Sequence, residues 1–118
     1  MLDPEMISHY TKALADVKLH YDRGYVRCVR PRGTVDQWMF HVTEIRKVRV
    51  QRSRAGMLRV RVYLVGSDEF NTPVLEYEDK DKLILACKAL LSLRDLELDI
   101  EPQIYCESAY SVQNIDYF

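Results

Sequence analysis

The chain has 118 residues, of which 47% are hydrophobic and 30% are charged, and its formal net charge is −1. This balance predicts one globular domain over residues 1–118 and excludes an extended disordered chain. No apolar run approaches the roughly 20 residues that cross a bilayer, and acids stand where a secretory signal would be basic. We therefore expect no transmembrane segment and a location in the cytoplasm, with the nucleus as the alternative.

The first predicted element is a helix over residues 4–22. Asp3 suits the N-cap position and Pro4 the first helical position. Spacings of three and four residues define one apolar stripe, made of Ile7, Tyr10, Leu14, Val17 and Tyr21. The glycine at position 24 then fits a helix C-terminal stop.

Residues 25–79 change to a two-residue period and predict an antiparallel sheet. Strands are expected over residues 25–30, 37–42, 43–52, 58–65 and 74–79, with connections at 30–34, 53–56 and 66–73. The strand 58–65 alternates most clearly. Its Val and Leu residues point to one side of the sheet, and Arg59, Arg61 and Tyr63 point to the other.

A second helix is predicted over residues 80–94, with an acidic tail over 95–118. One face of this helix carries the core residues Leu83, Ile84, Cys87, Leu90 and Leu91. A second apolar line consists of Leu85, Ala89 and Leu93. Because a helix that is apolar on two sides needs two coverings, we expect the sheet on one side and either the N-terminal helix or a partner chain on the other.

This order of elements predicts an α+β fold. It would comprise an N-terminal helix, an antiparallel sheet of about five to seven strands, and a C-terminal amphipathic helix packed on the sheet.

Charge is unevenly distributed along this fold. Residues 1–22 have a net charge of −2, residues 23–61 of +9, and residues 62–118 of −8. The basic middle region predicts either an anionic partner or internal pairing with the acidic C-terminal half.

The hairpin over residues 46–65 concentrates this positive charge. Keeping the valines on one side places Val50 opposite Leu58 or Val60, and therefore Arg49 opposite Arg59 or Arg61. Like charges in such positions destabilise a strand pair by about 0.2–1 kcal/mol. A further strand could offset the repulsion. Pairing Val62 with Leu75 would place Arg61 beside Glu76 and Arg59 beside Glu78.

Two interpretations of the basic residues therefore stay open. One is a solvated sheet face with cross-strand ion pairs, each of which contributes little. The other is an anion-binding surface, whose candidates are the residues without nearby acids on the hairpin and the basic residues around the first strand connection: Arg27, Arg30, Arg32, Lys47, Arg49, Arg52 and Arg54.

The segments VTEIRKVRV, LRVRVYLV and PVLEYEDKDKLILACKAL follow each other as basic strands and an amphipathic helix. This layout resembles the pleckstrin-homology-like superfold over about residues 25–94, with the N-terminal helix as an addition. In lipid-binding members, basic residues on and near the first strand hold inositol phosphates, and the resemblance gives this role to Arg27, Arg30 and Arg32. Other members dock proteins, so the resemblance implies a binding module of one of these two kinds.

No catalytic motif, phosphate-binding glycine loop or metal-ligand cluster is present in the sequence. We therefore expect no enzyme, no catalytic residue, no metal and no cofactor. Structural or surface roles fit His9, His20 and His41, and reduced thiols fit Cys28, Cys87 and Cys106.

The function expected first is a non-enzymatic protein-interaction module, either an adaptor or a complex subunit. It would bind a protein partner, or a second copy of itself, through Leu85, Ala89 and Leu93 of the second helix and through the basic sheet edge. The alternative is an anion-binding module for phosphoinositide headgroups or nucleic acid, acting through the basic region 27–61.

Overall fold

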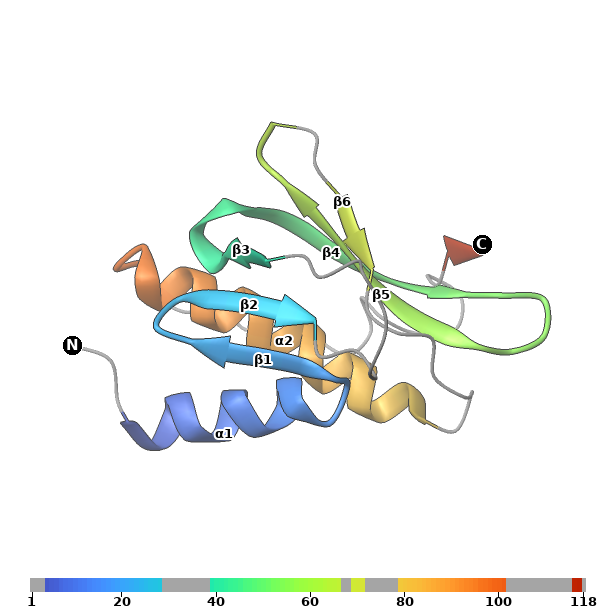
Figure 1. Cartoon of the computed structure of the whole chain (residues 1–118), viewed down its shortest axis with the longest axis horizontal. Coiled ribbons are helices and arrows are strands. Elements are labelled where there is room, and N and C mark those ends of the chain that lie inside the picture. Colours follow the sequence, from blue (N-terminus) through green and yellow to red (C-terminus); the bar gives the residue numbers. More distant parts are fainter. Residues whose placement is uncertain (1–3, 29–38, 67–68, 72–78, 102–115, 118) are drawn as a thin grey trace.

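The computed structural model describes residues 4–28, 39–66, 69–71, 79–101 and 116–117, and it has the expected α+β class (Figure 1). Two sheets take the place of the single expected sheet, with strand orders β1-β2-β3 and β6-β5-β4-β7. In chain order the elements are α1 (Pro4–Ala15), β1 (Leu19–Asp22), β2 (Tyr25–Cys28), β3 (Met39–His41), the short 3-10 helix η1 (Val42–Glu44), β4 (Ile45–Arg52), β5 (Leu58–Leu64), β6 (Glu69–Asn71), α2 (Lys80–Glu97) and β7 (Asp116–Tyr117).

The N-terminal helix ends at Ala15, so the helix predicted over 4–22 is wrong beyond that residue. Lys18 has a φ of 66°, and the chain reverses there into β1. The spacing of the apolar residues explains why a longer helix was predicted. Val17 and Tyr21 are four residues apart, and that spacing fits one face of a helix and one face of a strand equally well.

The glycine at position 24 belongs to a hairpin turn and does not cap a helix. Asp22 pairs with Tyr25, so Arg23 and Gly24 form a two-residue loop between β1 and β2. Their φ angles are 49° and 89°. Positive φ at both central positions is typical of the type I′ turn, whose twist matches that of the flanking strands.

The extended stretch predicted over residues 37–52 is interrupted at η1. The His41 backbone N–H donates to Glu44 Oε2 over 3.0 Å, and the Thr43 N–H donates to His41 Nδ1 over 3.3 Å. These reciprocal contacts form a capping box that turns the chain. The turn ends the first sheet at β3 and begins the second sheet at β4.

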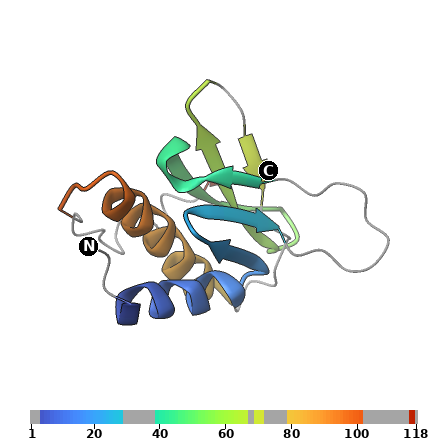
Figure 2. The ribbon, with the colours of Figure 1, turned by 60° about the vertical axis from the view of Figure 1, so that its left-hand side comes forward.

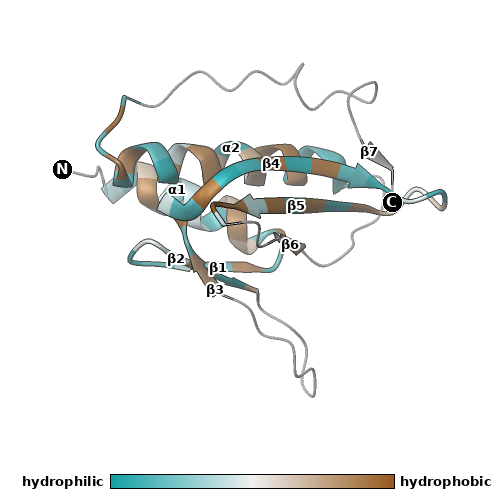
Figure 3. Cartoon of the chain, turned by 90° about the horizontal axis from the view of Figure 1, so that it is seen from above, coloured by the Kyte–Doolittle hydropathy of each residue, from teal (hydrophilic) through white to brown (hydrophobic). Residues whose placement is uncertain are grey.

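The β4–β5 hairpin has one of the two predicted registers. Val50 lies opposite Val60, and Arg49 lies opposite Arg61. Both valines are buried, as the alternation predicted. The hairpin places its apolar side against α2, which packs alongside β4 and β5 (Figure 3).

The strand beside β5 is β6, in a segment expected to be a loop. Val62 pairs with Phe70 and Arg61 with Asn71, so the predicted pairing of Val62 with Leu75 is wrong. The residues predicted to neutralise the arginines, Glu76 and Glu78, lie outside the described residues.

The expected acidic tail begins later than predicted, because α2 continues to Glu97. At the chain end, β7 pairs with β4 in parallel, with Arg52 opposite Tyr117. These two residues belong to the expected tail, where no strand was predicted at 116–117, and β4 is not a free edge at Arg52.

Both apolar sides of α2 are covered within the chain. The helix α1 packs against α2 on one side, while β4, β5 and η1 contact it on the other (Figures 1 and 2). The N-terminal helix thus supplies the second covering that the sequence required. Buried residues of α2 and of both sheets form one hydrophobic cluster, against which Ile7, Tyr10 and Ala13 of α1 pack.

Neither of the two helices in the described part of the chain has the length and apolar character needed to cross a bilayer.

Candidate anion-binding face

The outward side of β4 and β5 carries a cluster of cations around one tyrosine, and we call this surface the basic face. Except for Arg46, its members alternate with buried Val and Leu residues of the hairpin. They come from both strands: Arg46, Lys47, Arg49, Arg59, Arg61 and Tyr63. The first three are exposed, and the other three are partly buried. The two-residue period of each strand is therefore what gathers the positive charge on one side.

A β-bulge at the start of β4 adds a cation that strict alternation would have hidden. Ile45 pairs with Leu64 and Lys47 with Tyr63, so Arg46 is an extra residue without an opposite partner on β5. A bulge of this kind changes the direction of successive side chains. Arg46 and Lys47 are consequently both exposed, although they are neighbours in the chain.

Three cations converge on the ring of Tyr63. Lys47 Nζ lies 4.6 Å from the ring centroid, and the guanidinium carbons of Arg61 and Arg46 lie 5.7 and 5.9 Å from it. Each distance falls within the range of a cation–π interaction, which contributes about 0.5–1 kcal/mol at an exposed site. The tyrosine thus offsets part of the repulsion among these cations.

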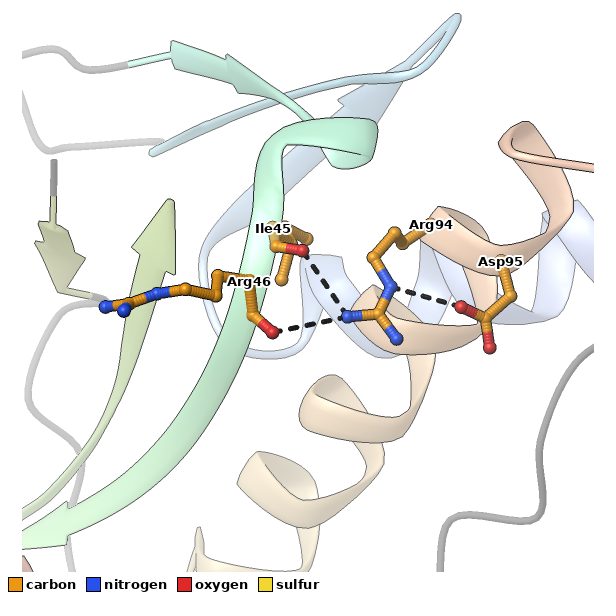
Figure 4. Close-up of polar contacts among 4 residues, drawn as sticks. All are labelled: Ile45, Arg46, Arg94 and Asp95. Carbon is orange, nitrogen blue, oxygen red and sulfur yellow. Dashed lines mark hydrogen bonds and ion pairs between the residues drawn. The ribbon is translucent and has the colours of Figure 1, made fainter. Parts of the chain in front are cut away.

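The side chain of Arg94 on α2 bonds to the backbone of the bulge (Figure 4). Arg94 Nη1 donates to the carbonyl oxygens of Ile45 and Arg46, over 3.4 and 3.5 Å, and Nε donates to Asp95 Oδ1 over 3.1 Å. The Asp95 side chain is only 4% exposed. These bonds to β4 go to backbone oxygens only. The Arg46 side chain itself points away from α2 (Figure 4).

The other end of the face is ordered by a polar contact between the strands. Arg59 Nε donates to Oε1 of the buried Gln51 over 2.9 Å. Partial burial, and then repulsion from Arg61, lowers the pKa of Arg59 from its ordinary value. Burial and the neighbouring charge of Arg61 therefore both disfavour the charged form of Arg59.

The predicted anion-binding residues do not form one surface. Lys47 and Arg49 lie in the basic face, the exposed Arg54 lies at the hairpin turn, and the partly buried Arg52 ends β4. Arg27 belongs to the other sheet, where it lines a separate hollow. The remaining two, Arg30 and Arg32, lie outside the described residues.

The sequence did not single out Arg46 or Tyr63. Arg46 was missed because a bulge leaves no mark in a pattern of alternating residues. The position of Tyr63 beside the arginines was visible in the strand pattern, but its contact with Lys47 depends on the register across the hairpin.

The predicted partner-binding line on α2 is mostly internal. Ala89 and Leu93 are fully buried, so the expectation that they form a docking surface is wrong. Packing of α1, β4, β5 and η1 around α2 leaves no such apolar stripe open. Leu85 alone of the three is exposed, at 48%, and it lines a hollow of about 200 Å³ with residues of α1.

Groups suited to covalent or metal chemistry are dispersed within the described residues. These residues contain no group of three or more His, Cys, Asp or Glu side chains that could hold a metal ion. Cys28 and Cys87 are buried free thiols, and burial raises the pKa of Cys87. Burial, followed by the charge of Glu97, also raises the pKa of Tyr21.

Comparisons of the chain with protein-family models, curated proteins and solved structures find no match. The basic face is therefore interpreted from its own geometry.

Replacement of Asp95 by Asn tests whether the contact between Asp95 and Arg94 stabilises the fold. We expect the free energy of unfolding to fall by about 1–3 kcal/mol, because the buried carboxylate that accepts from Arg94 loses its charge. Urea denaturation followed by circular dichroism measures this change. Asp99→Asn is the matched control, since Asp99 is exposed and has a φ of 56° that asparagine tolerates. Equal stability of the two variants would contradict the role given to Asp95.

Proposed function

We propose that the protein is a non-enzymatic binding module whose basic face binds the phosphate backbone of nucleic acid. The observation that carries the proposal is the convergence of Arg46, Lys47 and Arg61 on the single ring of Tyr63. Like charges at this density reduce stability, so their gathering fits a surface that serves binding rather than folding.

Two of these cations are open to a ligand. No acid among the described residues lies within ion-pair distance of Arg46 or Lys47, and both side chains are exposed. Arg49 adds a third exposed cation two residues further along β4. A phosphate that approaches Arg46 and Lys47 would therefore meet two charged groups without displacing an ion pair between described residues.

The shape of the face favours an extended polyanion over a compact headgroup. Lys47 and Arg49 project from the same side of one strand, about 7 Å apart by strand geometry. A hollow on the first sheet and one beside α1 are lined by described residues other than those of the basic face. A row of cations on a sheet suits successive phosphates of a chain, whereas a single headgroup is better held in a concave site.

A pleckstrin-homology-like architecture remains our proposal for the fold family. Within such a fold, phosphoinositide binding would depend on Arg30 and Arg32 in addition to Arg27. Docking of a protein partner on α2 is the less favoured function, because two of its three proposed contact residues are buried.

Fluorescence anisotropy with a labelled single-stranded oligonucleotide of mixed sequence tests the proposal. Binding should be saturable, should show little dependence on base sequence, and should weaken steeply with salt. Each phosphate contact contributes about −0.7 to the slope of log K against log salt concentration. A slope of about −2 or steeper is therefore expected from the three exposed cations of β4.

Vesicles that contain a phosphoinositide serve as the competing ligand in a parallel titration. Stronger binding to these vesicles than to the oligonucleotide would overturn the choice of nucleic acid. Absence of binding to either ligand at low salt would overturn anion binding as the function of this face.

A further inference from the structure

The outer side of the first sheet contains a second feature, which is separate from the basic face. It is an open hollow of about 380 Å³, lined by His20, Asp22, Arg23, Tyr25, Arg27 and Met39. This volume lies within the range of small-molecule sites, which is about 300–1,000 Å³. The hollow is lined by residues of β1, β2, β3 and the turn between β1 and β2, while Val26, Phe40 and Cys28 point to the core.

Strand register sets the lining in two rows. One row crosses all three strands, because Arg27 lies opposite His20 on one side and opposite Met39 on the other. In the next row, Tyr25 lies opposite Asp22 and His41. The rows are two residues apart, or about 7 Å. A single small ligand can therefore contact both rows.

Two large apolar side chains form an open platform in this hollow. Met39 is 60% exposed and Tyr25 is 49% exposed. The Tyr25 ring is steadied by an edge-to-face contact with His41, with the ring centroids 4.8 Å apart. A fixed, half-open aromatic ring beside a methionine is suited to contact with a flat ring of a ligand.

Charged groups surround this platform. Arg27 is exposed and lines the hollow, and it has no hydrogen bond or ion pair with any described residue. His20 lies opposite it and Arg23 lies in the adjoining turn. These groups are donors that suit a phosphate, whose oxygens accept several charge-assisted hydrogen bonds. Asp22 is the one acidic acceptor among the described residues of the lining.

We propose that this hollow binds a nucleoside monophosphate whose base carries an exocyclic amino group. The base stacks on Tyr25 and Met39, and its amino group donates to the Asp22 carboxylate. The phosphate is held by Arg27, with His20 beside it. This ligand can come from two sources, namely a free mononucleotide or the terminal nucleotide of a strand.

Isothermal titration with CMP, UMP and inorganic phosphate tests the proposal on the intact chain. CMP and UMP differ at two adjacent ring positions: cytosine has an amino donor at C4 and an acceptor at N3, whereas uracil has a carbonyl acceptor at C4 and an N3–H donor. CMP should bind about tenfold more tightly than UMP, because the C4 amino group of CMP donates to the Asp22 carboxylate, whereas the C4 carbonyl oxygen of UMP would face it as a second acceptor. Inorganic phosphate alone should bind at least about tenfold more weakly than CMP, because it lacks the stacking ring.

Two variants test whether CMP binds in the hollow. Arg27→Gln should weaken CMP binding about tenfold, and Tyr25→Ser should weaken it to a similar extent. Lys12→Gln removes one positive charge from α1, away from both surfaces, and should leave CMP binding unchanged. Both substituted hollow residues are exposed, so circular dichroism should show the folded chain in each case.

The two sources are separated by competition. If the ligand is a free nucleotide, an oligonucleotide with a 5′-phosphorylated cytidine should compete no better than CMP does. If the ligand is a strand terminus, this oligonucleotide should compete better than CMP and better than the same strand without the phosphate.

Failure of this proposal is distinguishable from failure of the proposed function. Equal affinity for CMP and UMP, CMP binding that Arg27→Gln leaves intact, or no saturable binding of CMP would each overturn the hollow as this site. None of these results depends on the basic face, whose binding is measured by the salt dependence of a long oligonucleotide.

Discussion

A chain in which Arg46, Lys47 and Arg49 are all replaced by glutamine should bind a single-stranded oligonucleotide at least about tenfold more weakly at low salt than the wild-type chain. The three side chains are the exposed cations of the basic face. Each should release a counterion from the nucleic acid on binding. The slope of log K against log salt concentration should therefore become shallower by about 2, and anisotropy titrations at several salt concentrations measure it.

A second triple variant with the same net charge provides the control. It replaces three lysines on the helices by glutamine: Lys12, Lys80 and Lys82. We expect its slope to match that of the wild-type chain, because a distributed change in net charge does not remove a phosphate contact. An equal loss of affinity in both variants would show that the net charge, and not the basic face, controls binding.

The basic-face variant should also keep its stability. Removing three neighbouring cations relieves repulsion and sacrifices two contacts with Tyr63, and these effects are of similar size. We expect the free energy of unfolding to change by no more than about 0.5 kcal/mol. The affinity loss would then belong to the surface and not to unfolding.

Replacement of Gly24 by Ala should cost about 2–4 kcal/mol of stability, which is the largest expected effect of a single methyl group in the described structure. A residue with a side chain at a φ of 89° is strained, at a cost of about 1–2 kcal/mol. In addition, the new Cβ would lie 2.3 Å from His41 Nε2. The ring would have to move, and with it the contact of His41 with Thr43 that begins η1.

Gly66→Ala separates the cost of backbone strain from the cost of the clash with His41. Gly66 has a φ of 93°, yet a Cβ there would meet no atom within 4 Å. Its substitution should therefore show the backbone strain alone. Thermal or urea unfolding of both variants measures the difference, which isolates the clash with His41. Equal destabilisation would mean that the His41 ring moves aside without cost.

The register of the β4–β5 hairpin illustrates what can be predicted locally. Sliding either strand by one residue would move Val50 and Val60 to the solvent side, so burial restricts the register to a few alternatives. Arg49 was consequently expected opposite Arg59 or Arg61, and it lies opposite Arg61. The same reasoning applies to α2, whose five predicted core residues are all buried.

The end of α1 shows where local patterns are ambiguous. The stripe that runs through Val17 and Tyr21 continues in period, but Val17 lies in the turn after α1 and Tyr21 lies in β1. The His20 side chain thereby moves from the expected helix to the hollow on the first sheet. No spacing in the sequence distinguishes these two outcomes, because both place the apolar residues in the core.

By itself, the sequence determined the α+β class, the two helices, the basic hairpin and its pair of permitted registers, since each depends on periodicity within a short segment. The tertiary structure alone decided the division into two sheets, the covering of α2 by α1 and the bulge that exposes Arg46. These features depend on contacts between distant segments. Arg94, for example, bonds carbonyl oxygens that lie 48 and 49 residues earlier in the chain. Such contacts arise only when the elements have packed, and so they leave no local pattern to read.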